Sequence, residues 1–182
     1  MSKPNVGGHS SRCRIVIDTC ADLSPEIAAT LDVDILGFPY ILDGEEHTDD
    51  IWSSITPHEF YEKLRQGAHA STSAVSLGRF LEFFTSCAEE GTPTVYLSFT
   101  AGLSSSYNSA CQAADMVREQ YPDFEIYVVD NCSPCGAAGL LALEAVRQRA
   151  AGLNARELAA WANEAKRYIH GFFTIDSLDA LA

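Results

Sequence analysis

Short apolar runs alternate with longer amphipathic segments along most of the chain. The runs at 13–18, 93–97 and 125–130 hold consecutive aliphatic and aromatic residues and predict buried strands. Between them, apolar residues return every three or four positions over 77–88 and 107–117, which is the spacing of one buried helix face. Strands that alternate with helices in this way predict an α/β fold with a mainly parallel sheet and flanking helices.

Local start and stop signals divide the chain further. Ser24 and Thr56 are each followed by proline, an arrangement that caps a helix and places proline at its first position. The helices that begin there are predicted to end near Leu31 and Arg65. Asp43-Gly44 is typical of a hairpin turn and predicts a small β-hairpin beside the parallel sheet.

The same apolar runs, caps and turn residues predict the remaining elements. Strands are expected over 34–42, 45–48 and 171–175, and helices over about 135–150, 155–168 and 176–181. Phe172, inside the last of these strands, is predicted to belong to the core. Residues 1–12 are polar and glycine-rich, and we expect them to form a flexible N-terminal tail.

Hydroxyl side chains precede two of the predicted helices. The segment from Ser71 to Ser76 stands before the helix over 77–88, while Ser104, Ser105 and Ser106 stand between a buried strand and the next helix. The first turn of a helix has N–H groups without intrahelical partners, so such positions bind anions without a cationic side chain. These two segments predict a site for a negatively charged head group at the carboxyl ends of the strands.

Serine and threonine also cap helices where no ligand binds, and this is the competing interpretation of the two segments. Residue spacing alone does not choose between capping and ligand binding for the hydroxyl residues of these segments.

Composition and charge exclude several classes of function. The chain has 182 residues, which suits one domain, and a net charge of −13 from 25 acidic and 12 basic residues. This charge is a poor match for nucleic acid. It also means that any anion site must act at short range, through N–H groups and hydroxyls.

No apolar run approaches the length of a membrane span, so an integral membrane protein is not expected. The six cysteines and the lack of a secretory signal favour free thiols in the cytoplasm.

Other chemistry-bearing residues have plainer interpretations. Asp18, Asp22 and Asp130 could form a metal or acid/base cluster, but we expect them to bond loop backbone, since no histidine stands at a ligand spacing. The pair Cys132 and Cys135 resembles a redox motif without the context that such motifs have. The chain has no nucleophile elbow, which argues against nucleophilic catalysis, and no phosphate-binding P-loop, so it is not expected to hydrolyse ATP or to transfer a phosphoryl group from it by itself. No cofactor is expected.

Four short segments, taken in order, resemble a known family. They are Asp18-Thr19-Cys20-Ala21-Asp22-Leu23, Thr72-Ser73-Ala74-Val75-Ser76, Leu103-Ser104-Ser105-Ser106-Tyr107-Asn108-Ser109-Ala110, and Val128-Val129-Asp130-Asn131 before a glycine-containing helix. The chain resembles the DegV family from about Arg14 to its last residue. Members of this family bind fatty acids and are the partners of bacterial fatty acid kinases.

The resemblance implies a binding mode. In the family, hydroxyls of the second and third segments hydrogen-bond the carboxylate of a long-chain fatty acid that lies between two domains. Carried over, these positions are Thr72 and Ser104, with Ser73 and Ser105 as neighbours, whereas Ser76 and Ser109 are expected only to cap helices. The family has glycine where this chain has Ser105, and we expect the serine to restrict the backbone or to narrow the approach to the site.

The resemblance also implies a role and a domain organisation. Residues 13–182 are expected to form the lipid-binding domain, with the family's C-terminal domain absent. The implied role is to bind a fatty acid and to present it to a separate kinase subunit, without enzymatic activity. Two alternatives stay open at this point. One is an enzyme that acts on a small carboxylated or phosphorylated metabolite through Asp18 or Asp130, and the other is a non-binding domain whose exposed apolar surface drives formation of a homodimer.

Overall fold

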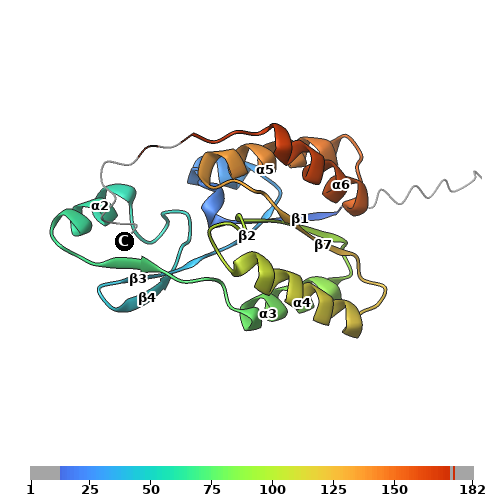
Figure 1. Ribbon diagram of the computed structural model, residues 1–182, viewed down its shortest axis with the longest axis horizontal. Helices are drawn as coiled ribbons and strands as arrows, with labels where there is room; N and C mark the ends of the chain where they lie inside the picture. Colours follow the sequence, from blue (N-terminus) through green and yellow to red (C-terminus); the bar gives the residue numbers. More distant parts are fainter. Residues whose placement is uncertain (1–12, 173, 175–182) are drawn as a thin grey trace, which may run out of the picture.

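The computed structural model describes residues 13–172 and 174, and its centre is a four-stranded parallel sheet (Figure 1). The strand order is β2-β1-β6-β7, and every neighbouring pair is parallel. The strands are β1 (Arg14–Asp18), β2 (Asp34–Leu36), β6 (Thr94–Ser98) and β7 (Ile126–Asp130). The predicted α/β fold with a mainly parallel sheet is therefore confirmed.

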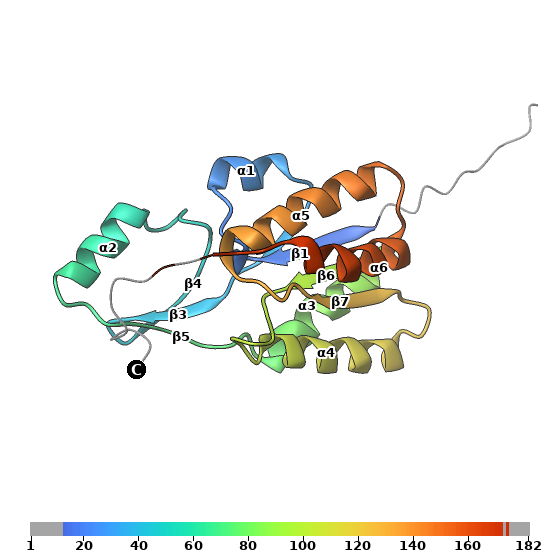
Figure 2. The same ribbon diagram turned by 45° about the horizontal axis from the view of Figure 1, so that its top comes forward.

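Helices cover both faces of this sheet (Figures 1 and 2). One layer is α3 (Leu77–Glu90) with α4 (Ser106–Gln120), and the other is α5 (Cys135–Ala150) with α6 (Ala155–Ala165). Side chains alternate along a strand, so Val16 and Tyr96 pack toward α3 and α4, while Ile15 and Leu97 pack toward the other layer. The remaining short helices of the described chain are η1 (Thr19–Ala21), α1 (Pro25–Thr30) and η2 (Lys166–Tyr168).

A second, smaller sheet lies at the carboxyl-end side of the parallel sheet, with a helix beside it (Figure 2). It is antiparallel with the order β4-β3-β5, and its strands are β3 (Pro39–Leu42), β4 (Glu45–Thr48) and β5 (Ala70–Thr72). The predicted Asp43-Gly44 turn joins β3 to β4, with both residues at positive φ. The accompanying helix, α2 (Pro57–Arg65), begins with the predicted proline and a complete capping box.

The single strand predicted over 34–42 is wrong, because two strands of different sheets occupy that range. The chain leaves the parallel sheet at Gly37, where an added Cβ would lie 2.4 Å from the backbone oxygen of Asp49. The backbone of the next residue, Phe38, forms its hydrogen bonds outside the parallel sheet. Its N–H donates to Thr19 Oγ1 (3.1 Å), and its oxygen accepts from Asp49 N (2.8 Å). Contacts with distant segments therefore divide what is locally one apolar run.

The last predicted strand is also wrong as far as it can be followed. Gly171, Phe172 and Thr174 belong to no strand, and Phe172 is 97% exposed rather than part of the core. A Cβ at Gly171 would lie 3.2 Å from Ala137 Cβ, so the segment runs over α5 instead of joining the sheet. The helix predicted over 176–181 lies outside the described residues.

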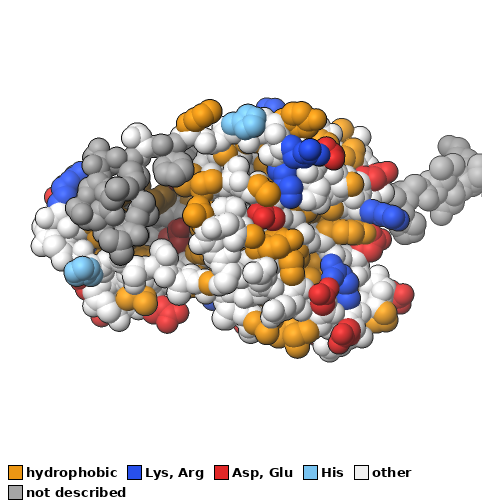
Figure 3. Space-filling model, in the orientation of Figure 1, with side chains coloured by type: hydrophobic (Ala, Val, Ile, Leu, Met, Phe, Trp, Pro, Cys, Tyr) orange, Lys and Arg blue, Asp and Glu red, His pale blue; other side chains and the backbone are white. Residues whose placement is uncertain are grey.

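Charged side chains of both signs are mixed among apolar patches on the face shown in Figure 3. The net charge of −13 is therefore not gathered into a single patch on that face. Within the described part of the chain, no helix is both long enough and apolar enough to cross a membrane.

Two glycines of α5 differ in what surrounds them. Gly139 faces η1, and an added Cβ would lie 2.6 Å from the backbone oxygen of Ala21. Gly136 stands in the first turn of the same helix with no atom within 4 Å of such a Cβ. Close packing against η1 therefore requires glycine at position 139 and not at position 136.

Gly139→Ala is expected to destabilise the protein by about 1–3 kcal/mol, because backbone atoms must move to relieve the contact. The midpoint of thermal unfolding should fall by roughly 2–4 °C for each kcal/mol lost. Gly136→Ala is the matched control, since alanine has the higher helix propensity and meets no atom there, so its midpoint should stay level or rise. If the unfolding midpoint fell equally in the two variants, the contact with Ala21 would not be the reason that position 139 requires glycine.

Candidate functional site

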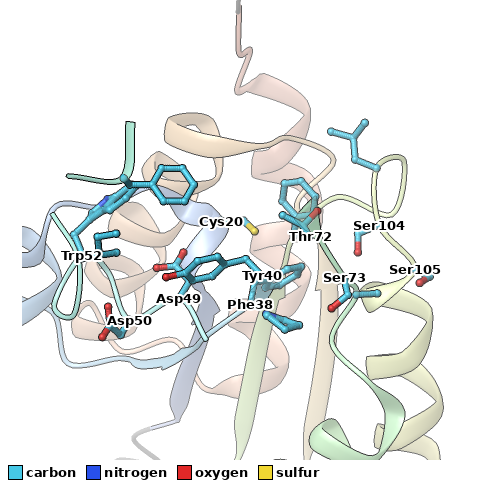
Figure 4. Close-up of a pocket in the computed structure, with 16 residues that line it drawn as sticks. Cys20, Phe38, Tyr40, Asp49, Asp50, Trp52, Thr72, Ser73, Ser104 and Ser105 are labelled. Carbon is cyan, nitrogen blue, oxygen red and sulfur yellow. The ribbon is translucent and has the colours of Figure 1, made fainter. Parts of the chain in front are cut away.

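A cavity of about 520 Å³ lies between the carboxyl ends of the parallel strands and the small antiparallel sheet (Figure 4). This volume falls in the range of about 300–1,000 Å³ that is usual for small-molecule sites. The parallel-sheet side contributes Cys20, Phe99, Leu103, Ser104 and Ser105, and the other side contributes Phe38, Pro39, Tyr40, Asp49, Asp50, Trp52, Ile55, Phe60, Thr72, Ser73 and Ala74. The wall is therefore largely aromatic and aliphatic, with a few polar groups.

The structure brings the four predicted hydroxyl residues to this one cavity. Ser104 and Ser105 lie in the turn that leads into α4, as the sequence predicted. Thr72 and Ser73 differ from the prediction, because Thr72 ends strand β5 and neither residue lies directly at the start of α3. Thr72, Ser73 and Ser105 are exposed and Ser104 is half-buried, so this end of the cavity is open.

A buried hydroxyl that the sequence analysis missed connects the two segments. Ser106 Oγ accepts a hydrogen bond from Val75 N (3.0 Å), and Ser104 Oγ both donates to Ser106 Oγ (2.9 Å) and accepts from Ser106 N (3.1 Å). Ser106 is completely buried. A signal was available, because Ser106 lies on the same helix face as the buried Ala110, Ala113 and Val117.

This arrangement leaves Ser104 able to donate to a ligand. A hydroxyl proton can rotate, so Ser104 can turn its O–H toward an anion in the cavity while its oxygen keeps accepting from Ser106 N. The Ser106 O–H then takes over the bond between the two hydroxyls. The pair can in this way stabilise a carboxylate without any cationic side chain.

Three expectations about serines now have outcomes. Ser76 caps α3, accepting from Arg79 N, as predicted. Ser109 is not a cap, because it lies inside α4 and its N–H donates to Ser105 O. Ser105 has φ −74° and ψ −4°, a conformation open to every residue, so the serine does not strain the backbone where the family has glycine.

Two of the aspartates at the strand ends bond loop backbone, as expected. Asp18 is 2% exposed and accepts from Phe99 N (2.7 Å), Tyr96 Oη (2.9 Å) and Cys20 N (3.1 Å). Asp130 accepts from Ala101 N (3.2 Å) and Cys132 N (2.8 Å). Neither carboxylate lines the cavity, which leaves the alternative of an enzyme working through them without geometric support.

Burial raises the pKa of Asp18 to about 6, against the opposing effect of its three hydrogen-bond donors. Burial and nearby negative charge, including Asp18, raise the pKa of the Cys20 thiol in the cavity wall. Cys135 also has a raised pKa, from burial and from Asp22. A raised pKa is the reverse of what a reactive thiolate needs, and both Cys132 and Cys135 are free.

Comparison with known proteins identifies the family. A sequence model of the DegV family matches residues 12–182. The chain belongs to the DegV family. A DegV domain-containing protein of Clostridium perfringens is 38% identical over 167 residues, which are 92% of this chain and 57% of that protein. This chain thus spans little more than half the length of that relative.

Two solved structures have the same fold. A stearic acid-binding protein from Eubacterium ventriosum matches with a TM-score of 0.73 and 32% identity, over 83% of this chain and 52% of that one. A DegV family protein from Thermus thermophilus, described as binding fatty acid, matches with a TM-score of 0.72 and 27% identity, over 86% of this chain and 54% of that one. Fatty-acid-binding proteins are therefore among the structural neighbours of this chain.

The buried Asp18 carboxylate predicts a pH dependence of stability. Its pKa is about 6 in the folded state against an ordinary value of 3.8, so the unfolded chain loses this proton first as pH rises. The stability from the protonated carboxyl is present below pH 3.8 and is lost as pH rises through about 6. A difference of roughly two pKa units corresponds to about 3 kcal/mol.

Asp18→Asn has no proton to lose, so its unfolding free energy relative to wild type should rise by about 3 kcal/mol between acidic and neutral pH. Urea denaturation at several pH values measures this change. The exposed Asp123→Asn is the control for removal of a single carboxylate. Parallel pH profiles for wild type and Asp18→Asn would contradict the prediction.

Proposed function

We propose that this DegV protein binds a long-chain fatty acid in the cavity, with its carboxylate at Thr72 and Ser104 and with Ser73 and Ser105 beside it. The observation that supports this most is the composition of the cavity, where four hydroxyl residues meet an aromatic and aliphatic wall (Figure 4). A ligand matched to this cavity has one small anionic head and an extended apolar body. The fatty acids bound by the related Eubacterium and Thermus proteins have this form.

The energetics assign different tasks to the two parts of the site. Ten buried methylenes contribute about 8 kcal/mol, so the apolar wall supplies most of the affinity. Removing the carboxylate from water costs several kcal/mol unless hydrogen bonds replace the lost hydration. No Lys or Arg stands among the described residues that line the cavity. The hydroxyls therefore decide where the head group rests.

The second part of the proposal is that the bound fatty acid is presented to a separate kinase. A carboxylate oxygen would attack the γ-phosphorus of ATP held by that kinase, the bond to ADP would break, and an acyl phosphate would form. Support comes from the exposure of Thr72, Ser73 and Ser105, which leaves the head-group end accessible. Leu103, 69% exposed beside these hydroxyls, offers an apolar contact for a partner.

We propose further that residues 13–182 form the lipid-binding domain of this system. The matched relatives are longer, and the part of them that this chain does not match is the expected source of a cover over the cavity. Lipid mass spectrometry on this chain beside a longer relative tests this. Much weaker lipid retention by residues 1–182 would support a cover supplied by the part of the relatives that they do not match, and equal retention would contradict it.

Removal of the two central hydroxyls tests the binding proposal. Thr72→Val/Ser104→Ala should weaken stearic acid binding by at least about 100-fold, because it removes two hydrogen bonds to a charged group, each worth about 1.5–3 kcal/mol. Binding is measured by the fluorescence of Trp52, whose ring lines the cavity. Valine keeps the shape of threonine, so the loss would belong to the hydroxyl.

Two controls accompany this variant. Thr72→Ser keeps a hydroxyl at the same position and should retain most of the affinity. Ser86→Ala removes an exposed hydroxyl of α3 that bonds only within its own helix, and it should bind as wild type does. Full affinity in the double variant would contradict the proposed carboxylate site.

Presentation is tested with a purified bacterial fatty acid kinase, ATP and the lipid-loaded protein. Hydroxylamine should trap an acyl hydroxamate in this mixture and not when either protein is omitted. Stable lipid binding without hydroxamate formation would contradict presentation and leave the binding proposal intact.

A further inference from the structure

The segment between β4 and α2 has an unusual backbone conformation where it borders the cavity. Ile51 and Trp52 have φ of 57° and 62°, so two consecutive residues other than glycine are left-handed. A β-branched residue such as Ile51 is especially unfavourable there, because its Cβ crowds the backbone. Such conformations persist only where the surroundings determine them, and they are concentrated at functional sites.

Two aspartates hold this strained turn. Asp49 Oδ1 accepts from Ile51 N (3.0 Å), and Asp50 Oδ1 accepts from Ser53 N (2.9 Å) and from Ser54 N (3.2 Å). The start of the turn is fixed as well, because Asp49 N donates to Phe38 O (2.8 Å) next to the close approach at Gly37. Hydrogen bonds therefore fix both ends of this turn: Asp49 N bonds Phe38 O at its start, and Asp50 accepts from Ser53 N and Ser54 N at its end.

The result of this conformation is the position of one large side chain. Trp52 lines the cavity and packs edge-to-face on Phe60, with ring centroids 5.9 Å apart, and Phe60 packs in the same way on Tyr40. Figure 4 shows Trp52 on the side of the cavity opposite Ser104 and Ser105. An aromatic row thus runs from Tyr40, the strand partner of Thr72, to Trp52 on the side of the cavity opposite Ser104 and Ser105.

Charge determines which end of a fatty acid can approach this wall. Asp49 and Asp50 both line the cavity on the Trp52 side, and like charges repel a carboxylate there. The hydroxyl end offers donors instead. The ligand's methyl end therefore faces Trp52.

We infer that Trp52 is the end stop of the acyl channel and determines the longest fatty acid chain that the cavity accepts. This inference rests on the proposed function and adds a specificity-determining residue to it. A chain that ends short of the indole gains affinity with every added methylene. A chain that reaches the indole has to bend or to leave part of itself in water, and it gains nothing more.

The test is the affinity of the protein for saturated fatty acids of increasing length, from about 8 to about 20 carbons, by titration calorimetry. Each methylene that finds room should raise the affinity about fourfold, until a plateau is reached. In Trp52→Ala the plateau should move to chains longer by at least two carbons. Trp52→Phe should give an intermediate shift and serves where alanine impairs folding.

Trp161→Phe is the matched control, because it shortens a tryptophan of α6 that does not line the cavity, and its plateau should equal that of wild type. An unchanged plateau in Trp52→Ala and Trp52→Phe would overturn this inference alone. If wild type bound no fatty acid of any length, the proposed function would fail and this inference with it. The two failures are therefore distinguishable.

Discussion

The buried hydroxyl of Ser106 is the constraint on which the geometry of the site depends. It belongs to α4, yet it accepts from Val75 N in the segment that follows β5, and it also bonds Ser104. The small sheet supplies Thr72 and the turn before α4 supplies Ser104, and this hydroxyl bonds directly between the two segments that carry them. Because Ser106 is fully buried, loss of its hydrogen bond to Val75 N or to Ser104 would leave a buried polar group without a partner, which costs free energy. This cost favours a single arrangement of the two segments.

Asp18 has the corresponding task within the parallel sheet. It is the last residue of β1, and it orders the turns after β1 and β6 by accepting from Cys20 N and Phe99 N, both of which belong to cavity-lining residues. The same burial that makes these bonds strong raises its pKa and makes the charged form costly at neutral pH. Asp18 thus lowers the stability of the fold at neutral pH while it positions residues of the cavity wall, although it does not itself line the cavity. Such local costs are common near functional sites.

How much could be predicted depended on whether the signal was local. Three of the four parallel strands (β1, β6 and β7), both proline-initiated helices and the Asp43-Gly44 hairpin were predicted, because periodicity, caps and turn residues act over a few positions. Thr72 and Ser104 were found as candidates through the family resemblance, and the structure places them at one cavity. The break at Gly37 was missed, because it depends on a contact with Asp49. Strand β5 is three exposed residues long and has no pattern of its own.

The Trp52 side of the cavity could not be predicted from the sequence, for a related physical reason. The sequence of residues 49–55 does not indicate that Ile51 and Trp52 adopt left-handed conformations. In the structure that conformation is accompanied by hydrogen bonds from the turn's own N–H groups to the carboxylates of Asp49 and Asp50. In the proposed binding mode, the same two acids repel an anion from one end of the cavity while neutral hydroxyls accept it at the other. Under this proposal, a protein of net charge −13 orients an anionic lipid without a cationic group among the described residues that line the cavity.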